Sequence, residues 1–454
     1  MLKTQINSDN LLDSQLKENF WLVSADMGYG HLRAIYPLKA LSRGGQILNI
    51  NTSPYSTGKE RRLWKEMLGT YEFMSRAGKL PFIGSLISKI LNSLLYIPNF
   101  YPIKDRSNTT FQVRYLKKSI KRGLCKGILE QTKWPELPMI TSFYSSAIAA
   151  EMEDRKNIYC IICDTDLNRV WVQEDASSSH IIYFASGTIS AQRLLSYGVP
   201  EKNIILTGFP LPIELLGDRN LNTLRKNFIR RLINLDPAEI FYNLYKHSLN
   251  ALIQYDELKE ELAGSKSITI TYAVGGAGAQ KEIGRQIARN LRERILSDQV
   301  KLNLVAGTRT ELRDYFLHIK QDLPDHNENI QIIWAEDHEK YFDLFNQCLH
   351  TTDVLWTKPS ELSFYCALGI PIIMTPAIGP QEKCNRRWLR EIGAGFKQQN
   401  PELTDQWLFD LLNKGRLAEA AWNGFLKARK YGTYNILDFL ETGTFVSSND
   451  PLKR

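Results

Sequence analysis

A strand, a glycine-rich turn and a helix follow one another at two widely separated places in the chain. The first unit reads FWLVSA, DMGYG and then a helical segment that starts at His31. The second unit, SITITYAVGGAGAQKEIGRQIARNL, occupies residues 267–291. Short apolar runs then alternate with helical segments, a pattern typical of parallel, doubly wound sheets. We therefore predict an α/β fold with two Rossmann-like domains that face a cleft.

The apolar runs that follow each unit place the remaining strands and the domain boundaries. Strands are predicted at 46–51, 138–143, 158–163, 181–184, 203–207, 301–306, 330–334, 353–356 and 370–375. Residues 213–265 carry helical periodicity and dense charge without a strand. The predicted parts are an N-terminal domain (1–212), a helical connector or insertion (213–265), a C-terminal domain (266–425), and a helix and tail (426–454) that cross back to the first domain.

Composition limits the class of protein. The 454 residues suffice for two or three domains, and the net charge of +8 makes phosphates or an anionic membrane surface plausible partners. No nucleic-acid-reading motif is present, and the six cysteines form no zinc pattern. Neither a signal peptide nor a bilayer-length apolar run is found. We expect a cytoplasmic protein, with a peripheral place on the inner membrane face left open, and no metal or cofactor.

The first glycine turn carries polar residues that are well placed for chemistry. Gly28 and Gly30 allow the backbone to approach a ligand closely, and the N-terminus of the next helix favours negative charge. His31 and Arg33 lie in the first helical turn and are predicted to face the cleft. A histidine here can take a proton from an acceptor hydroxyl. The alternative is that His31 caps the helix or packs structurally.

A second group of candidates follows the strand IYCIIC. Asp164, Thr165 and Asp166 stand at its carboxyl end, where carboxylates serve as acid–base groups or orient substrate hydroxyls. We select Asp166 as the second catalytic candidate, either to orient His31 or to bind the acceptor. A helix N-cap is the alternative role.

The second glycine turn has the context that phosphate binding requires, a strand before it and a helix after it. Its residues are Gly275, Gly276, Ala277 and Gly278. Arg309 follows the next strand and is placed to reach a phosphate, and Trp334 ends the strand after that. A tight turn without a ligand is the alternative.

The segment TKPSELSFYCALGIPIIMTPAIGPQEKCN, residues 357–385, holds the densest set of candidates. It reads as turn, helix, buried strand, a loop rich in glycine and proline, and a second helix. A loop after a parallel strand opens at the carboxyl edge of the sheet, where open α/β sheets bind ligands. The candidate binding residues are Thr357, Lys358, Ser360, Glu361, Gln381, Glu382 and Asn385.

This segment resembles the donor-nucleotide motif of GT-B glycosyltransferases. The resemblance is strongest to monogalactosyldiacylglycerol synthase, the processive diacylglycerol glucosyltransferases and the N-acetylglucosaminyltransferase that completes lipid II. Residues 379–385 follow the family's Pro-Gly-Gln-Glu-x-x-Asn, which contacts the donor sugar hydroxyls. Residues 30–34 resemble Gly-His-Arg-Ala-Ser with Leu32 inserted, and Thr165-Asp166-Leu167 matches Thr-Asp-Leu.

The resemblance implies transfer of a sugar from a UDP-linked donor to a lipid or lipid-like acceptor, with inversion and without a metal. His31 is then the base, the second glycine turn and Arg309 approach the diphosphate, and the loop at Trp334 holds the uracil ring. Two positions depart from the family. The inserted Leu32 turns Arg33 by about 100° around the helix. Phe364 stands where relatives carry the glutamate that binds ribose, which leaves Ser360 or Glu361 for that contact.

A predicted amphipathic helix bears on where such a protein works. Residues 82–97, FIGSLISKILNSLLYI, place apolar side chains on one continuous stripe, and basic residues cluster downstream of them. Such a helix can lie in the headgroup layer of a membrane, or it can pack on the domain core.

The sequence therefore favours a GT-B glycosyltransferase acting on a lipid acceptor. A non-catalytic GT-B protein is the first alternative, because the TKPSE loop differs from the family. A nucleotide-sugar epimerase of the same architecture is the second.

Overall fold

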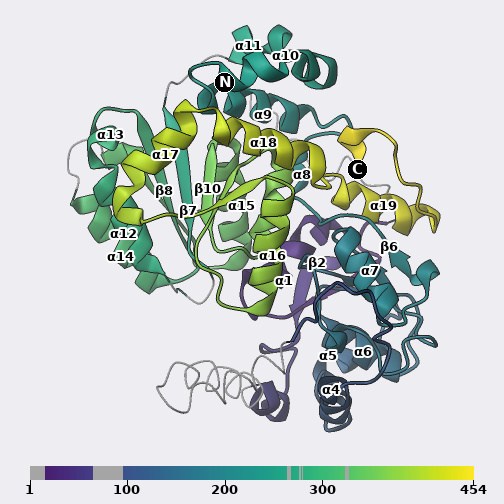
Figure 1. Cartoon of the computed structure of the whole chain (residues 1–454). Helices are drawn as coiled ribbons and strands as arrows, with labels where there is room; N and C mark the ends of the chain where they lie inside the picture. The colour runs from purple at the N-terminus through teal and green to yellow at the C-terminus, as the bar shows by residue number, and fades with distance from the viewer. Residues whose placement is uncertain (1–15, 65–95, 263–266, 276–277, 279, 323–326) are drawn as a thin grey trace.

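Two six-stranded parallel sheets form the two halves of the molecule (Figure 1). The structure is a computed structural model that describes residues 16–64, 96–262, 267–275, 278, 280–322 and 327–454. Every strand pair in both sheets is parallel, and helices cover the sheets. The predicted α/β fold with two Rossmann-like, doubly wound domains is confirmed.

The N-terminal sheet has the strand order β2-β1-β3-β4-β5-β6. Its strands are β1 (Phe20–Ser24), β2 (Ser42–Asn49), β3 (Met139–Thr141), β4 (Ile158–Ile161), β5 (Ile182–Phe184) and β6 (Ile204–Ile205). Its helices are α1 (Tyr29–Ile35), η2 (Tyr36–Leu41), α4 (Phe111–Lys121), α5 (Lys126–Gln131), α6 (Tyr144–Met152), η3 (Arg169–Trp171), α7 (Thr188–Ser196) and η4 (Glu201–Asn203). All five residues of β1 are buried, as expected for a central strand with both faces covered.

The C-terminal sheet has the order β12-β11-β10-β7-β8-β9. Its strands are β7 (Ile268–Ala273), β8 (Val300–Gly307), β9 (Ile330–Trp334), β10 (Val354–Thr357), β11 (Ile372–Met374) and β12 (Gly395–Lys397). Its helices are α12 (Lys281–Asn290), α13 (Arg292–Leu296), α14 (Thr310–Gln321), η5 (Asn327–Asn329), α15 (His338–Thr351), η6 (Glu361–Leu368), α16 (Pro380–Glu391), η7 (Pro401–Leu403), α17 (Thr404–Asn413) and α18 (Arg416–Lys427). The edge strand β12 was not predicted, because its three residues are not fully buried and lack an apolar run.

The strand orders locate a ligand crevice in each domain. In the N-terminal sheet the order reverses between β1 and β3, and in the C-terminal sheet it reverses between β7 and β10. Open α/β sheets bind ligands at such switch points, beyond the carboxyl ends of the strands. The turn that carries His31 follows β1, and the turn that carries Gly275 follows β7. Both glycine turns therefore stand at switch points.

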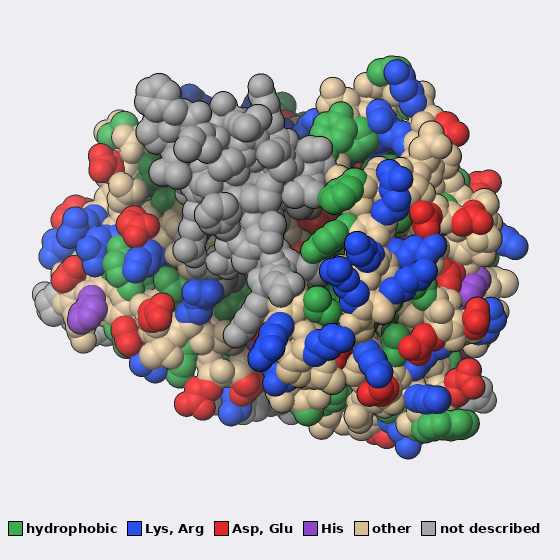
Figure 2. Space-filling view, turned by 90° about the horizontal axis from the view of Figure 1, so that it is seen from below, with side chains coloured by type: hydrophobic (Ala, Val, Ile, Leu, Met, Phe, Trp, Pro, Cys, Tyr) green, Lys and Arg blue, Asp and Glu red, His purple; other side chains and the backbone are tan. Residues whose placement is uncertain are grey.

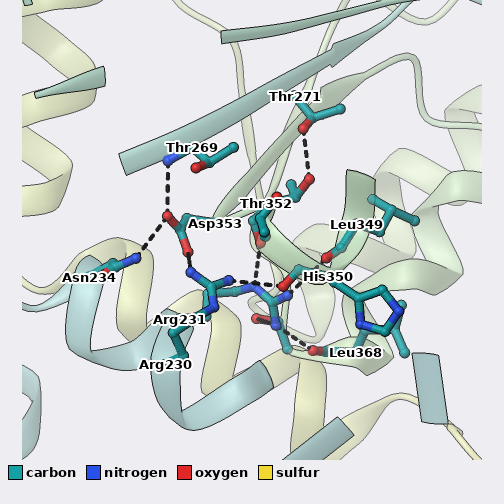
Figure 3. Close-up of polar contacts among 12 residues, drawn as sticks. Arg230, Arg231, Asn234, Thr269, Thr271, Leu349, His350, Thr352, Asp353 and Leu368 are labelled. Atoms are coloured by element: carbon teal, nitrogen blue, oxygen red, sulfur yellow. Dashed lines mark hydrogen bonds and ion pairs between the residues drawn. The ribbon is translucent and has the colours of Figure 1, made fainter. Parts of the chain in front are cut away.

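The segment between the sheets is helical, as predicted, and it packs on the C-terminal domain. It contains α8 (Ile213–Leu216), α9 (Asn222–Leu235), α10 (Ile240–Ile253) and α11 (Tyr255–Leu262). Figure 3 shows how two arginines of α9 hold it. Arg230 pairs with the buried carboxylate of Asp353 at 3.0 Å, and Arg231 donates to the carbonyls of Thr352 (2.7 Å) and Leu368 (2.8 Å). Arg231 thus satisfies carbonyls beyond α15 and at the end of η6 that would otherwise be buried without a donor.

The end of the chain returns to the N-terminal sheet. Helix α19 (Gly432–Thr442) lies beside α7 and β6 (Figure 1, yellow), and η8 (Pro451–Lys453) follows it. The Phe439 ring lies 5.7 Å from that of Phe184, and the Asn435 amide donates to the Thr207 carbonyl at 2.8 Å. The two domains are therefore connected by chain at two places.

The predicted amphipathic helix and the six cysteines can be compared with this fold. Throughout the described ranges, no helix has the length and hydropathy needed to cross a bilayer. Most of the predicted helix at 82–97 falls in 65–95, outside the described residues. All six cysteines are free; five of them are buried, and Cys384 is half-buried.

Candidate active site at the domain interface

Helix α1 carries the N-terminal glycine turn into contact with the C-terminal domain. Gly28 caps the helix with φ +106°, a conformation that suits glycine. The Tyr29 hydroxyl accepts a hydrogen bond from the Thr308 backbone N–H at 2.9 Å, and its ring lies 4.8 Å from that of Tyr341. Gly307 leaves room for this contact, because a Cβ there would overlap the Tyr29 hydroxyl. The carboxyl edges of the two sheets are therefore joined directly.

The side chain of Arg33 is buried against the C-terminal domain. Its Nε lies 3.2 Å from Oε1 of Glu361, and its Nη2 donates to the Tyr341 hydroxyl at 2.9 Å. The guanidinium also lies 4.6 Å from the Phe345 ring centroid. Burial works against the charge, but Tyr341 and Glu361 outweigh it, and the pKa of Arg33 is raised. The guanidinium stays charged inside a cage of aromatic rings.

His31 and Arg33, which were both predicted to face the cleft, have partners in different domains. Two residues along an α-helix turn a side chain by about 200°. His31 therefore lies against its own domain, while Arg33 lies against the opposite one. Arg33 links the domains through Glu361 and is not on the acceptor side of the site as predicted.

His31 is held as a neutral imidazole with a defined tautomer. Its Nδ1 lies 2.7 Å from the Ser142 carbonyl, and the ring packs edge-on against Phe143 with centroids 4.8 Å apart. A carbonyl only accepts, so Nδ1 carries the hydrogen and Nε2 keeps its lone pair. Burial lowers the pKa of His31, and the bond to Ser142 and the charge of Glu361 oppose this only in part. His31 does not cap the helix, since Gly28 is the N-cap.

Asp166 lies in the core of the N-terminal domain. Its two carboxylate oxygens accept hydrogen bonds from Arg193, at 2.8 Å from Nε and 2.9 Å from Nη2, and its side chain is 1% exposed. Among the described residues, the group that orients His31 is Ser142. The prediction that Asp166 orients His31 is therefore wrong, because a buried arginine takes both of its oxygens.

Asp164, two residues earlier, is the carboxylate that faces the other domain. Its Oδ1 accepts a hydrogen bond from the Asn385 amide at 2.9 Å. Burial raises the pKa of Asp164 to about 6, and Glu361 and Glu382 add to this rise while Asn385 and Lys358 oppose it. The sequence signal was available, since Asp164 directly follows the predicted strand 158–163, but the Thr-Asp-Leu resemblance favoured Asp166.

Asn385 connects the domains and has no free hydrogen-bonding position. Its oxygen accepts from the backbone N–H (3.0 Å) and the hydroxyl (2.8 Å) of Thr165. Its nitrogen donates to Asp164 and to the Pro359 carbonyl, at 2.9 and 3.2 Å. The side chain is completely buried. The predicted contact between Asn385 and a donor sugar is therefore corrected, because the protein itself uses every donor and acceptor of the amide.

Two cations flank the C-terminal glycine turn. A Cβ added at Gly275 would lie 2.7 Å from Cε of Lys358, and one added at Gly278 would lie 3.6 Å from Nη1 of Arg309. The other predicted members of the turn, Gly276 and Ala277, are outside the described residues. Backbone at a switch point, with positive charge on both sides, is suited to a diphosphate.

Lys358 is paired with Glu382 across this crevice. Its Nζ lies 3.0 Å from Oε1, and the other oxygen of Glu382 accepts from the Ile378 N–H at 2.7 Å. Burial lowers the pKa of Lys358, but Glu382 and Glu361 outweigh this effect and the pKa is raised. Gln381 is half-buried next to Gly379 in the same corner.

The remaining predicted residues of the TKPSE loop have contacts within the protein. The Thr357 hydroxyl donates to the Ala273 carbonyl at 3.1 Å, and Ser360 is buried. Phe364 stacks on Phe209 of the N-terminal domain with ring centroids 4.8 Å apart. Glu361 is paired with Arg33. The suggested ribose contact through Ser360 or Glu361 remains a prediction.

A cavity of about 500 Å³ lies beside Trp334, in the loop that the family resemblance associates with the uracil ring. It is lined by Trp334, Ala335, Glu336, Lys340, Asp343 and Leu344. Arg313 lies 4.4 Å from the Trp334 ring, whose buried Nε1 has no hydrogen-bond partner among the described residues. In the described part of the chain, no three His, Cys, Asp or Glu side chains are grouped to hold a metal ion.

Comparison with known proteins gives three kinds of similarity. A family model described as a domain of unknown function (DUF6938) matches residues 308–436. The processive diacylglycerol beta-glucosyltransferase of Bacillus subtilis (strain 168) is 22% identical over 52% of this chain and 49% of its own length. The enzyme of the same name from Bacillus pumilus (strain SAFR-032) is 20% identical over 65% of each chain. The match thus spans half to about two thirds of these relatives.

Among solved structures, the UDP-GlcNAc 2-epimerase from Neisseria meningitidis bound to UDP-GlcNAc is similar with a TM-score of 0.46 and 14% identity, covering 93% of this chain and 98% of that one. The resemblance predicted from the motifs agrees with the sequence matches. The chain is similar in sequence, at 20–22% identity, to the processive diacylglycerol beta-glucosyltransferases, and it is built as two Rossmann-like domains.

Proposed function

We propose that this protein is an inverting glycosyltransferase that moves a sugar from a UDP-linked donor to the hydroxyl of a lipid or lipid-like acceptor. One observation carries the proposal. A neutral His31 stands at the switch point of the N-terminal sheet, and the glycine turn after β7, flanked by Lys358 and Arg309, stands at the switch point of the C-terminal sheet. Glu361 influences the pKa of both His31 and Lys358, so the two groups share one electrostatic environment.

The donor is proposed to lie on the C-terminal domain. The glycine turn, Lys358 and Arg309 would meet the diphosphate, and the cavity beside Trp334 would take the nucleobase. As the bond between the anomeric carbon and the phosphate oxygen breaks, the diphosphate leaves with the electron pair. Fixed positive groups that meet this developing charge supply the larger part of the rate enhancement.

His31 is proposed to act on the acceptor. Its Nε2 lone pair would take the hydroxyl proton while the acceptor oxygen attacks the anomeric carbon from the face opposite the diphosphate, which inverts the configuration. The bond from Nδ1 to Ser142 fixes the tautomer that this step needs. A lowered pKa keeps the imidazole unprotonated at neutral pH.

A basic and apolar face supports a lipid acceptor. Figure 2 shows Lys and Arg side chains together with hydrophobic ones on the lower face of the molecule. Residues 101–122, which include helix α4, carry the basic side chains Lys104, Arg106, Arg114, Lys117, Lys118, Lys121 and Arg122. Tyr101, Ile103, Phe111 and Tyr115 are exposed beside them. Cations next to exposed aromatic and aliphatic groups suit the headgroup region of an anionic membrane.

Isothermal titration of the full chain with UDP, UDP-glucose, UDP-galactose and UDP-GlcNAc tests the proposal. Binding of UDP at micromolar to millimolar concentration is expected, followed by sugar transfer to diacylglycerol in mixed vesicles. Absence of heat at millimolar UDP would count decisively against it.

A nucleotide-binding protein without transferase activity is the second candidate. It is favoured by the commitment of Glu361 to Arg33 and of Asn385 to the other domain, since relatives use these segments for the donor. UDP binding without product from any donor would support it. Epimerised or hydrolysed donor formed without an acceptor would instead indicate an epimerase.

A further inference from the structure

Asp164 is a carboxylate that the proposed chemistry does not use. It follows β4 and points from the N-terminal domain toward α16, where Asn385 donates to its Oδ1 at 2.9 Å. Asn385 is itself fixed by Thr165 and by the Pro359 carbonyl. The carboxylate therefore has one defined orientation at the domain interface.

The second oxygen of Asp164 is open. Within the described residues, no hydrogen bond reaches Oδ2, and no cation is paired with the carboxylate. The titratable groups around it are Lys358 and Glu361 after β10, Glu382 and Cys384 on α16, and the neighbouring Cys163. Lys358 is already paired with Glu382, and Glu361 with Arg33. Asp164 is half-buried, and Oδ2 is not among the enclosed polar atoms that lack a partner, so a bound hydrogen-bond donor can reach it.

The neighbours of Asp164 indicate what it can bind. Lys358 contacts both Glu382 and the glycine turn proposed to hold the diphosphate, so Asp164 lies toward the part of the donor beyond the phosphates. A carboxylate repels a phosphate and only accepts hydrogen bonds when ionised. The neutral, hydroxylated sugar is the part of a UDP-sugar that matches these properties.

On the basis of the proposed function, we propose that Asp164 is a specificity-determining residue that accepts a hydrogen bond from a hydroxyl of the donor sugar through Oδ2. Asn385 is its positioning residue. A site built to bind a hydroxyl discriminates against a donor that lacks the group, because the bound donor then covers the acceptor without giving it a partner. The contact exists for UDP-sugars and not for UDP.

Titration of the full chain with UDP and with UDP-sugars tests this assignment. Asp164→Asn keeps the size of the side chain and an oxygen for Asn385, and it is expected to weaken UDP-sugar binding about 10- to 100-fold with UDP affinity unchanged. Asp164→Ala should give the same selective loss. Glu151→Gln is the matched control, since Glu151 is a buried carboxylate that accepts hydrogen bonds from Ser179 and His180 in the same domain.

The pH dependence gives an independent readout. Protonation of Asp164, whose pKa is about 6, should weaken UDP-sugar binding relative to UDP between pH 7.5 and pH 5 in the unmodified protein and not in Asp164→Asn. Equal effects of the substitution on UDP and UDP-sugars, or no effect on either, would overturn the assignment. If the unmodified protein binds no UDP, the proposed function fails and this inference fails with it.

Discussion

The Nε atom of Arg33 lies 3.2 Å from Oε1 of Glu361, and this ion pair joins the two domains. Both side chains are almost fully buried, at 4% and 9% exposure. Arg33 is on the same short helix as His31, and Glu361 begins the helix that follows the lysine of the C-terminal crevice. The pair therefore fixes the distance between the proposed base and the proposed donor site.

Removal of either partner of this pair should destabilise the protein. Glu361→Gln leaves a buried guanidinium without its counter-charge, and Arg33→Met leaves a buried carboxylate, so each should lower the free energy of unfolding by about 3 kcal/mol. Urea unfolding followed by fluorescence measures the loss. The double variant should lose less than the sum of the two, because neither charge then remains unpaired. Additive losses would show that the two side chains do not interact.

Substitution of His31 should separate chemistry from donor binding. His31→Ala removes the proposed base and should reduce kcat for sugar transfer about 10²- to 10⁴-fold. The UDP dissociation constant should stay within a factor of two, since the glycine turn, Lys358 and Arg309 are unchanged. Titration calorimetry and a product assay test both statements. Full activity in this variant would exclude His31 as the base.

The pH profile of transfer should reflect the environment of His31. Burial lowers the pKa of this side chain below 6.5, so the neutral form persists at lower pH than for a free histidine. The acid limb of kcat/KM that belongs to His31 should therefore have its midpoint below pH 6.5. Asp164, with a pKa of about 6, titrates in the same pH range. An acid limb that belongs to His31 should therefore remain in Asp164→Asn, where residue 164 no longer ionises. An acid limb above pH 7 would contradict the proposed neutral imidazole.

Asp164 should make stability depend on pH with a defined sign. Its pKa rises from 3.8 to about 6 on folding, so its favourable contribution is present below pH 3.8 and is lost as the pH rises through about 6. Asparagine does not ionise. Asp164→Asn should therefore be more stable than the unmodified protein at pH 8, by on the order of 1 kcal/mol, and the difference should shrink toward pH 4. A less stable variant at pH 8 would show that the carboxylate gains more from its neighbours than burial costs.

Arg231 should be essential for docking the connector helix α9. Burial lowers its pKa to about 9, which still leaves it charged at neutral pH, and its partners are carbonyls. Arg231→Met leaves these buried carbonyls without donors and should lower stability by about 2–4 kcal/mol. Lys226→Met on the same helix is the control; its partner Glu261 is 3.8 Å away and both side chains are more than half exposed, so a change within about 0.5 kcal/mol is expected. Equal losses in a thermal or urea melt would rule out the anchoring role.

The local sequence was sufficient for the fold and for one side of the site. Apolar runs such as 158–161 identify central parallel strands, because such strands are covered on both faces. The glycine turns follow β1 and β7, so their place at the carboxyl edges of the sheets could be deduced from pattern alone. The place of Lys358 at the same edge could be deduced in the same way, because it directly follows β10. The short edge strand β12 had no such signal.

The contacts between the domains could not be read from the sequence. Arg33 and Glu361 are 328 positions apart, and Thr165 and Asn385 are 220 apart. Whether a polar residue at a sheet edge is free for a ligand or is used by the protein depends on how the two edges are oriented. That orientation commits Asn385 to Thr165 and Asp164 of the other domain. Asp166 is instead held by Arg193 within its own domain, a pairing 27 positions apart that the local pattern does not reveal.

The order of strands, turns and helices is thus set by the chain itself, through hydrophobic periodicity and the backbone freedom of glycine, both of which act over a few residues. Which side chains meet across the interface is decided only by the tertiary structure. Hydrogen bonds and ion pairs act over a few ångströms, and the residues that form them here come within that range only because the two sheets lie edge to edge.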